Sequence, residues 1–132
     1  MKSDGLPVTK PHALQFKRTE EYVSIGDAYY NRLATKDIYA IAAMYPAEQD
    51  ALIDLAYDVF NNTGHKIGGY AEYTQEDPRT DTPAFDAYVQ LMQIDSDEEI
   101  MWGDAGIAHF YIDPADLAKK DFSKVMYYWD CS

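Results

Sequence analysis

Two apolar runs on either side of an acidic bend constrain the fold of this chain more than any other feature. Residues 88–94 (YVQLMQI) and 107–112 (IAHFYI) carry apolar side chains on both alternating faces. A strand that is exposed on one side alternates apolar and polar residues, so we expect both runs to be strands covered on both sides. Gln90 and Gln93 interrupt the first run. Each amide must then face solvent or a hydrogen-bonding neighbour.

The segment between these runs is predicted to be a turn. Residues 95–99 (DSDEE) hold four carboxylates, which are too costly to bury in an apolar core. Gly103 and Gly106 follow, and their spacing indicates backbone angles that other residues avoid. We therefore expect the two runs to be neighbours in one antiparallel sheet.

The sequence predicts three helices in the first half of the chain. Ser24 and the acidic residue three positions later resemble a capping box, which predicts a short helix that continues to Leu33. Asp37 is placed to cap residues 38–45, and Pro46 to begin a helix that runs to residue 60. The apolar residues of that last helix fall at helical spacing and define one stripe: Leu52, Leu55, Ala56, Val59 and Phe60.

The remaining segments complete the fold prediction. Residues 75–83 are polar and rich in turn formers, so they should form an exposed loop. Asp113 and the following proline signal a short helix, and residues 122–129 a final strand. We predict an N-terminal arm over residues 1–16. Residues 17–132 are predicted to form a single α+β domain, an antiparallel sheet with packed helices.

Charge narrows the partners that such a domain can bind. The 132 residues include 11 Lys and Arg against 23 Asp and Glu, a net charge of −12. This charge repels nucleic acid and anionic membranes, so we predict neither as a partner; it suits a basic protein. The one cysteine, Cys131, fits a reducing compartment, and the N-terminus lacks the apolar core of a signal peptide. We expect a cytoplasmic protein.

Several polar residues near strand ends are candidates for a small-ligand site: His65, Asp77, Arg79, Trp102 and Asp104. A histidine beside an aspartate could exchange protons, but His109 lies within an apolar run and fits a structural role better. An EF-hand loop counted from Asp95 fails, because Ile100 holds the glycine position. We assign no metal, no cofactor and no catalytic residue, and we favour a role other than that of an enzyme.

Five motifs in order along the chain resemble the YwqG-like family, a bacterial domain of unknown function. They are HKIGGY at 65–70, TQEDPR at 74–79, LMQIDSD at 91–97, MWGDAGIAHFYI at 101–112 and DFSKVMYYWDC at 121–131. The resemblance covers the last half of the chain most strongly and corresponds to the C-terminal half of longer members. It supplies no catalytic residues. It implies a role like that of the immunity proteins encoded beside secreted toxins.

These observations favour a protein-binding module that acts on a basic partner. The twelve tyrosines support a recognition surface, for which we name Glu20, Glu21, Tyr22, Tyr29, Tyr30, Tyr70, Tyr73 and Tyr88. Two alternatives stay open. One is a small-ligand binder or hydrolase-type enzyme with a site near His65, Asp77, Trp102 and Asp104. The other is a structural half-protein that pairs with itself, as a homo-oligomer, or with a missing half.

Overall fold

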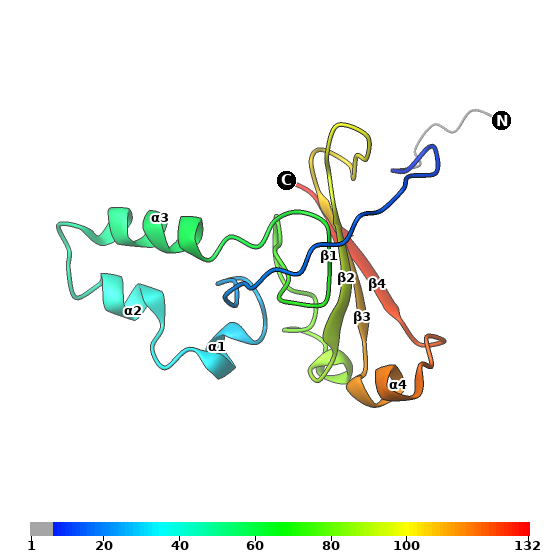
Figure 1. Cartoon of the computed structure of the whole chain (residues 1–132). Helices are drawn as coiled ribbons and strands as arrows, with labels where there is room; N and C mark the ends of the chain where they lie inside the picture. The colour runs from blue at the N-terminus through cyan, green and yellow to red at the C-terminus, as the bar shows by residue number, and fades with distance from the viewer. Residues whose placement is uncertain (1–6) are drawn as a thin grey trace.

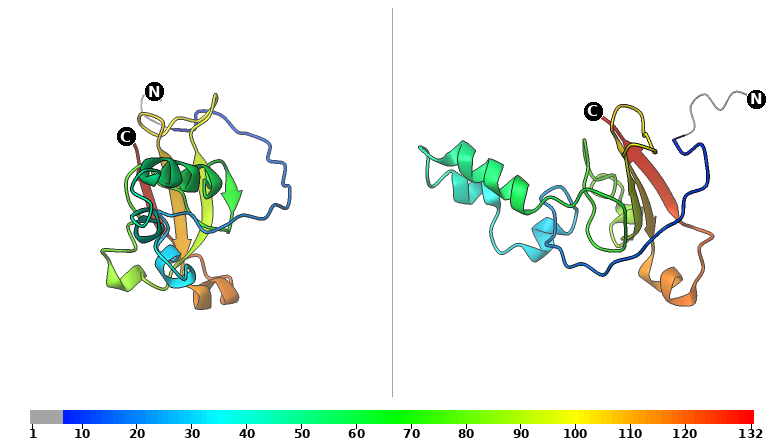
Figure 2. Two further views of the ribbon diagram at one scale, coloured as in Figure 1. Left: turned by 90° about the vertical axis from the view of Figure 1, so that its left-hand side faces the viewer. Right: turned by 45° about the horizontal axis from the view of Figure 1, so that its top comes forward.

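The computed structural model describes residues 7–132, so the first six residues of the predicted arm lie outside the described part (Figure 1). From residue 7 to the first helix the chain has no regular secondary structure and passes beside one edge of the sheet (Figures 1 and 2). The elements that follow are α1 (Tyr30–Leu33), α2 (Ile38–Ala42), α3 (Gln49–Val59), β1 (Lys66–Ile67), η1 (Pro83–Phe85), β2 (Val89–Asp95), β3 (Ile107–Ile112), α4 (Pro114–Lys119) and β4 (Met126–Asp130).

The four strands form one antiparallel sheet in the order β1-β2-β3-β4. The two apolar runs become β2 and β3, which pair from Val89 with Ile112 to Asp95 with Ile107. The α+β class, the antiparallel sheet and this central pairing are therefore confirmed. The predicted final strand is shorter, because β4 begins only at Met126.

Coverage of the sheet is nearly complete at β3 and partial at β2. Five of the six β3 residues are buried, as expected for a strand covered on both sides. In β2, only the two glutamines are buried, and the apolar side chains around them are half-buried. The face that carries Phe110 also carries Tyr127, which is half exposed. The prediction of two covered faces thus holds for β3 and is wrong for β2.

The two glutamines of β2 are buried because their amides have partners. Gln93 donates to the backbone oxygens of Asn62 and Gly64, at 2.9 and 3.0 Å, and accepts from the N–H of Glu72. Gln90 donates to the backbone oxygen of Gly68 at 3.0 Å. A satisfied amide costs little to bury. These residues tie residues 62–72 to the sheet.

The bend between β2 and β3 confirms the predicted turn. The Asp97 carboxylate accepts the N–H groups of Glu99 and Ile100 at 2.7 Å each. Gly103 has a φ of +58°, the left-handed value that its position predicted. Gly106 is needed for a different reason, since a Cβ there would collide with the backbone oxygen of Asp130 in β4.

Two helix caps are confirmed, although α2 and α3 are shorter than the sequence predicted. Asp37 and Asp113 cap α2 and α4, each side chain accepting from the N–H two residues on, at 3.1 and 2.7 Å. The Ser24 prediction is wrong: its hydroxyl donates to the backbone oxygen of Ala71, and the first helix begins only at Tyr30.

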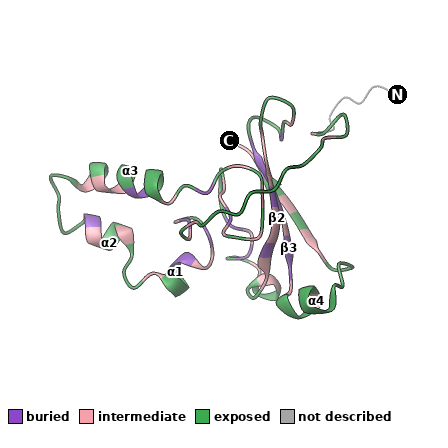
Figure 3. Ribbon diagram, viewed as in Figure 1, coloured by how far each residue is buried: buried purple, intermediate pink, exposed green. Residues whose placement is uncertain are grey.

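Two of the helices, α2 and α3, pack on each other and not on the sheet. α2 and α3 lie antiparallel against each other and project away from the sheet as a hairpin (Figures 1 and 2). Segments without helix or strand, residues 24–29 and 71–80, lie between the hairpin and the sheet instead. The buried residues gather there and in β3, while the hairpin is largely exposed (Figure 3). The domain therefore has a buried interior around the sheet and a projecting, exposed helical hairpin.

Candidate functional site

Three charged side chains meet in the interior, between the sheet and the segments that cover it. The Arg79 guanidinium lies 2.7 Å from Asp77 and 3.0 Å from Asp27, measured from Nη2 to the carboxylate oxygens. All three side chains are almost fully shielded from water. We call Asp27, Asp77 and Arg79 the Arg79 cluster.

The guanidinium of the Arg79 cluster is saturated with partners. Its Nε donates to Asp77 at 3.0 Å, and its Nη1 donates to the backbone oxygen of Tyr88 at 2.9 Å. The rings of Tyr29 and Tyr111 lie 5.4 and 4.7 Å from the guanidinium carbon, within range of cation–π attraction. This bonding indicates a structural role, in which the cation joins the covering segments to the start of β2.

The two carboxylates extend the network into the backbone. Asp77 accepts the N–H of Ala28, and Asp27 accepts the N–H of Ala71, both at 2.7 Å. Two segments that are far apart in sequence, residues 24–29 and 71–80, are therefore fixed to each other by charge-assisted hydrogen bonds. These bonds satisfy groups that would otherwise be buried without partners.

Burial and pairing act in opposite directions on these groups. Burial alone would raise the pKa of Asp77, but the hydrogen bonds and charge of Arg79 outweigh it and hold that pKa below its ordinary value of 3.8. Burial likewise opposes the charge on Arg79, whose pKa is nevertheless raised by Asp77 and by neighbouring charges. Both residues are thus ionised across the physiological pH range.

His109 lies beside the cluster in an aromatic stack. Its ring is 4.7 Å from that of Tyr73 and 5.8 Å from that of Tyr111, measured between centroids. Burial lowers the pKa of His109 to about 3, so the imidazole is neutral at pH 7. Its Nδ1 lies 3.4 Å from the Gln90 amide oxygen, and no acidic side chain bonds it within the described residues. This geometry agrees with the structural role expected for it.

A pocket of about 310 Å³ opens beside the cluster. Asp27 and Arg79 form part of its wall, and most of the remaining lining is apolar or aromatic. The other lining residues are Tyr29, Leu33, Gly69, Tyr70, Val89 and Gln90. Its volume is at the lower end of the range for small-molecule sites.

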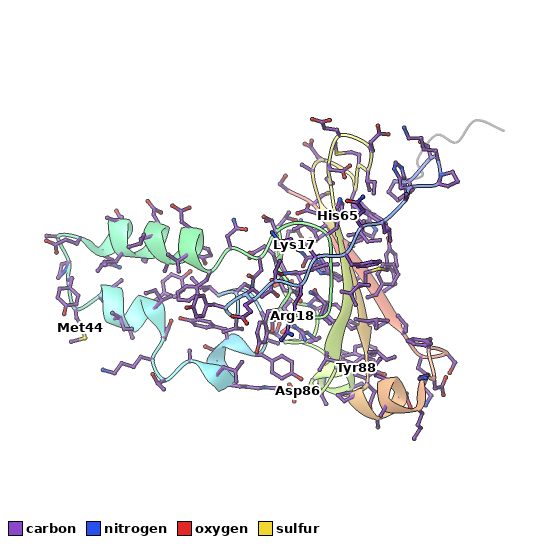
Figure 4. All side chains as sticks on the ribbon, viewed as in Figure 1. Lys17, Arg18, Met44, His65, Asp86 and Tyr88 are labelled. Atoms are coloured by element: carbon purple, nitrogen blue, oxygen red, sulfur yellow. The ribbon has the colours of Figure 1, made fainter. Side chains whose placement is uncertain are left out.

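The five predicted ligand residues divide between the two ends of β2. Asp77 and Arg79 are together, near Tyr88 at the start of the strand. His65 lies at the opposite end, where its imidazole is 2.8 Å from Asp97 (Figure 4). Trp102 and Asp104 belong to the turn before β3, whose first residue pairs with the last of β2. The two groups are about 20 Å apart along the strand.

Two predictions about exposure are wrong for particular residues only, since most of the loop over residues 75–83 is exposed as predicted. The loop over residues 75–83 was expected to be exposed, yet Asp77 and Arg79 are each only 2% exposed, because each neutralises the other. The predicted recognition surface included Tyr30, which is buried, and Tyr73, whose hydroxyl bonds that of Tyr111. No local signal in the sequence identified Asp27, since its partners lie in distant segments.

The tyrosines that are exposed together lie on the α2–α3 hairpin. Tyr39 and Tyr57 join the two helices through a hydroxyl–hydroxyl hydrogen bond of 2.6 Å, which raises the pKa of Tyr57 to about 12. Met44, at the tip of the hairpin, is 69% exposed (Figure 4). The other large apolar or aromatic side chains exposed on the hairpin are Tyr45, Leu55 and Val59.

The hairpin is also strongly acidic. Residues 37–64 include five carboxylates and no Lys or Arg. The carboxylates are Asp37, Glu48, Asp50, Asp54 and Asp58. A surface that combines exposed apolar groups with charge of one sign is typical of a site for another macromolecule.

Other kinds of site are not evident in the described residues. Across residues 7–132, no three His, Cys, Asp or Glu side chains gather in a way that could hold a metal ion. In the same part of the chain, no helix has the length and apolar character needed to cross a bilayer.

The fold and the buried cluster define an α+β domain in which ionic hydrogen bonds fix irregular segments to a four-stranded antiparallel sheet. The chain belongs to the family of the domain of unknown function DUF1963, which it matches over residues 2–131. None of the curated proteins matches the chain.

The Arg79 cluster predicts an asymmetric effect of removing an arginine. We expect Arg79→Met to lower the free energy of unfolding by about 3–5 kcal/mol, because two carboxylates would remain buried without their cation. Arg32→Met is the matched control, since Arg32 pairs with Asp86 at the surface, where a pair contributes less than about 1 kcal/mol. Urea denaturation measures both. An equal loss of unfolding free energy in the two variants would contradict a stabilising role for the Arg79 cluster.

His109 predicts acid sensitivity in a defined pH window. The unfolded chain binds a proton at this residue below its ordinary pKa of 6.5, and the folded chain only below about 3, so stability falls as the pH drops between these values. From pH 7 to pH 5 we expect a loss of about 2 kcal/mol in the free energy of unfolding. Asp77, whose pKa is held below its ordinary value of 3.8, makes stability depend on pH only below that value, outside this window.

The measurement is urea denaturation at both pH values. His109→Gln should remove most of this dependence, whereas His65→Gln, which removes an exposed imidazole, should retain it. A His109→Gln variant with the slope of the parent would show that the buried imidazole is not the source.

Proposed function

We propose that this domain is a protein-binding module whose partner is a basic protein, and that the partner docks on the α2–α3 hairpin. The observation that carries the proposal is the coincidence of five carboxylates, no basic residue and several exposed apolar side chains in residues 37–64. Interfaces favour aromatic residues and methionine, and the hairpin exposes Tyr39, Met44, Tyr45 and Tyr57.

The rest of the molecule supports this assignment. The saturated guanidinium of Arg79 and the neutral imidazole of His109 are explained by stability, which leaves the hairpin as a feature that folding alone does not explain. A net charge of −12 also steers a basic partner toward the domain over long range. The resemblance to the YwqG-like family, an immunity-like role and a cytoplasmic location remain predictions within this proposal.

Charge-neutral variants test the proposal. The triple variant Asp50→Asn/Asp54→Asn/Asp58→Asn removes three charges from α3, and none of these side chains makes a hydrogen bond in the described part of the chain. The matched control, Glu76→Gln/Asp81→Asn/Glu98→Gln, removes three exposed charges elsewhere and reaches the same net charge. Each purified protein is immobilised and exposed to host lysate at about 50 and about 300 mM salt.

The expected result is a basic protein that the parent and the control retain at low salt and release at high salt. The hairpin variant should retain at least about tenfold less of it, a difference of about 1.4 kcal/mol. Equal retention by the two triple variants would place binding elsewhere. Capture of nothing by the parent at either salt concentration would overturn the proposal.

The pocket beside Arg79 supports a second candidate function, binding of a small ligand. Its walls include two aromatic rings and apolar side chains, which suit an aromatic or aliphatic molecule rather than an anion. Titration with aromatic fragments should then shift the backbone NMR signals of Gly69 and Gln90, and Leu33→Glu should abolish these shifts. Fragments that leave both signals unmoved would count against this candidate.

A further inference from the structure

One apolar face of α3 is only partly covered, because Leu52 is half-buried and Leu55 and Val59 are exposed. Leu52, Leu55 and Val59 follow one another at spacings of three and four residues, so they lie in a row along one side of the helix. We call these three residues the α3 strip. Leu55 and Val59 are 57% and 53% exposed, whereas Ala56 of the same predicted stripe is buried. Only part of the predicted stripe is therefore covered.

Carboxylates border the α3 strip and define the charge of its occupant. Asp54 and Asp58 are four residues apart, so they are neighbours on the helix surface, and Asp58 is also three residues beyond Leu55. α3 contains three aspartates and no basic side chain. A second copy of the chain docked on the same face would bring like charges together, which is unfavourable. The charge therefore favours a segment with lysine or arginine.

The backbone of α3 selects the conformation of that segment. Within a helix the N–H and C=O groups are already bonded internally, so the α3 strip offers no main-chain partners to an extended strand. An extended segment over apolar side chains would leave its own backbone groups unsatisfied. A helix satisfies these groups itself and can pack its side chains between those of α3.

We propose that the α3 strip binds an amphipathic basic helix of a partner protein, which lies alongside α3 and adds a third helix to the hairpin. The inference rests on the proposed function and specifies the form of the partner. From Leu52 to Val59 the strip advances seven residue steps, about 10 Å along the axis, which corresponds to about two helical turns. The recognised segment should therefore carry apolar residues at i, i+3 or i+4, and i+7, with Lys or Arg beside them.

Two synthetic peptides of the same composition test the conformation. Each has about 14 residues of leucine and lysine; one places leucine at helical spacing, and the other alternates leucine and lysine as in a strand. We expect the helical peptide to bind the full chain at least about tenfold more tightly by calorimetry. Its circular dichroism should become more helical on binding, and the NMR methyl signals of Leu55 and Val59 should shift.

Variants locate the binding surface. Leu55→Ser/Val59→Ser should weaken binding of the helical peptide at least about tenfold. Leu14→Ser/Phe16→Ser, which removes two still more exposed apolar groups from the N-terminal arm, should not. Equal affinity for the two peptides, or no effect of the strip variant, would overturn the helix inference and leave the basic partner in place. If neither peptide binds, the helix inference fails. The proposed function is tested separately by the lysate experiment.

Discussion

The buried cation of Arg79 is the interaction on which the rest of the structure depends. Burying a guanidinium is costly unless opposite charges and hydrogen-bond acceptors replace its water, and Asp27, Asp77 and the backbone oxygen of Tyr88 supply them. Each of these carboxylates also accepts a backbone N–H from the segment that carries the other, Asp77 from Ala28 and Asp27 from Ala71. Neutralisation of one charge therefore also determines how residues 24–29 and 71–80 lie on the sheet.

The way the sheet is covered also determines what the surface exposes. Because irregular segments occupy the space over the sheet, the helices are not needed to cover it. α2 and α3 contact each other, and each buries one residue, Ala42 and Ala56, while much of what remains is exposed. The polar residues that resemble a catalytic site thus lie in the interior, where they stabilise the fold. The acidic and apolar residues that suit a partner lie on the projecting hairpin.

Local signals in the sequence predicted local structure. The two-sided apolar pattern predicted β2 and β3, and a single side chain predicted each of the caps at Asp37 and Asp113. The Arg79 cluster could not be predicted, because it joins residues from distant segments and a polar loop normally indicates exposure. The exposed half of the α3 stripe escaped prediction for a related reason: periodicity shows that residues share a face, but not whether anything covers it.

Native-state hydrogen exchange measures the central claim most directly. The N–H of Ala28 is bonded to Asp77, and that of Ala71 to Asp27, although neither residue belongs to a helix or a strand. If the Arg79 cluster holds the covering segments in place, both amides exchange as slowly as those of β3. Exchange as fast as in exposed loops, while β3 stays protected, would contradict the account.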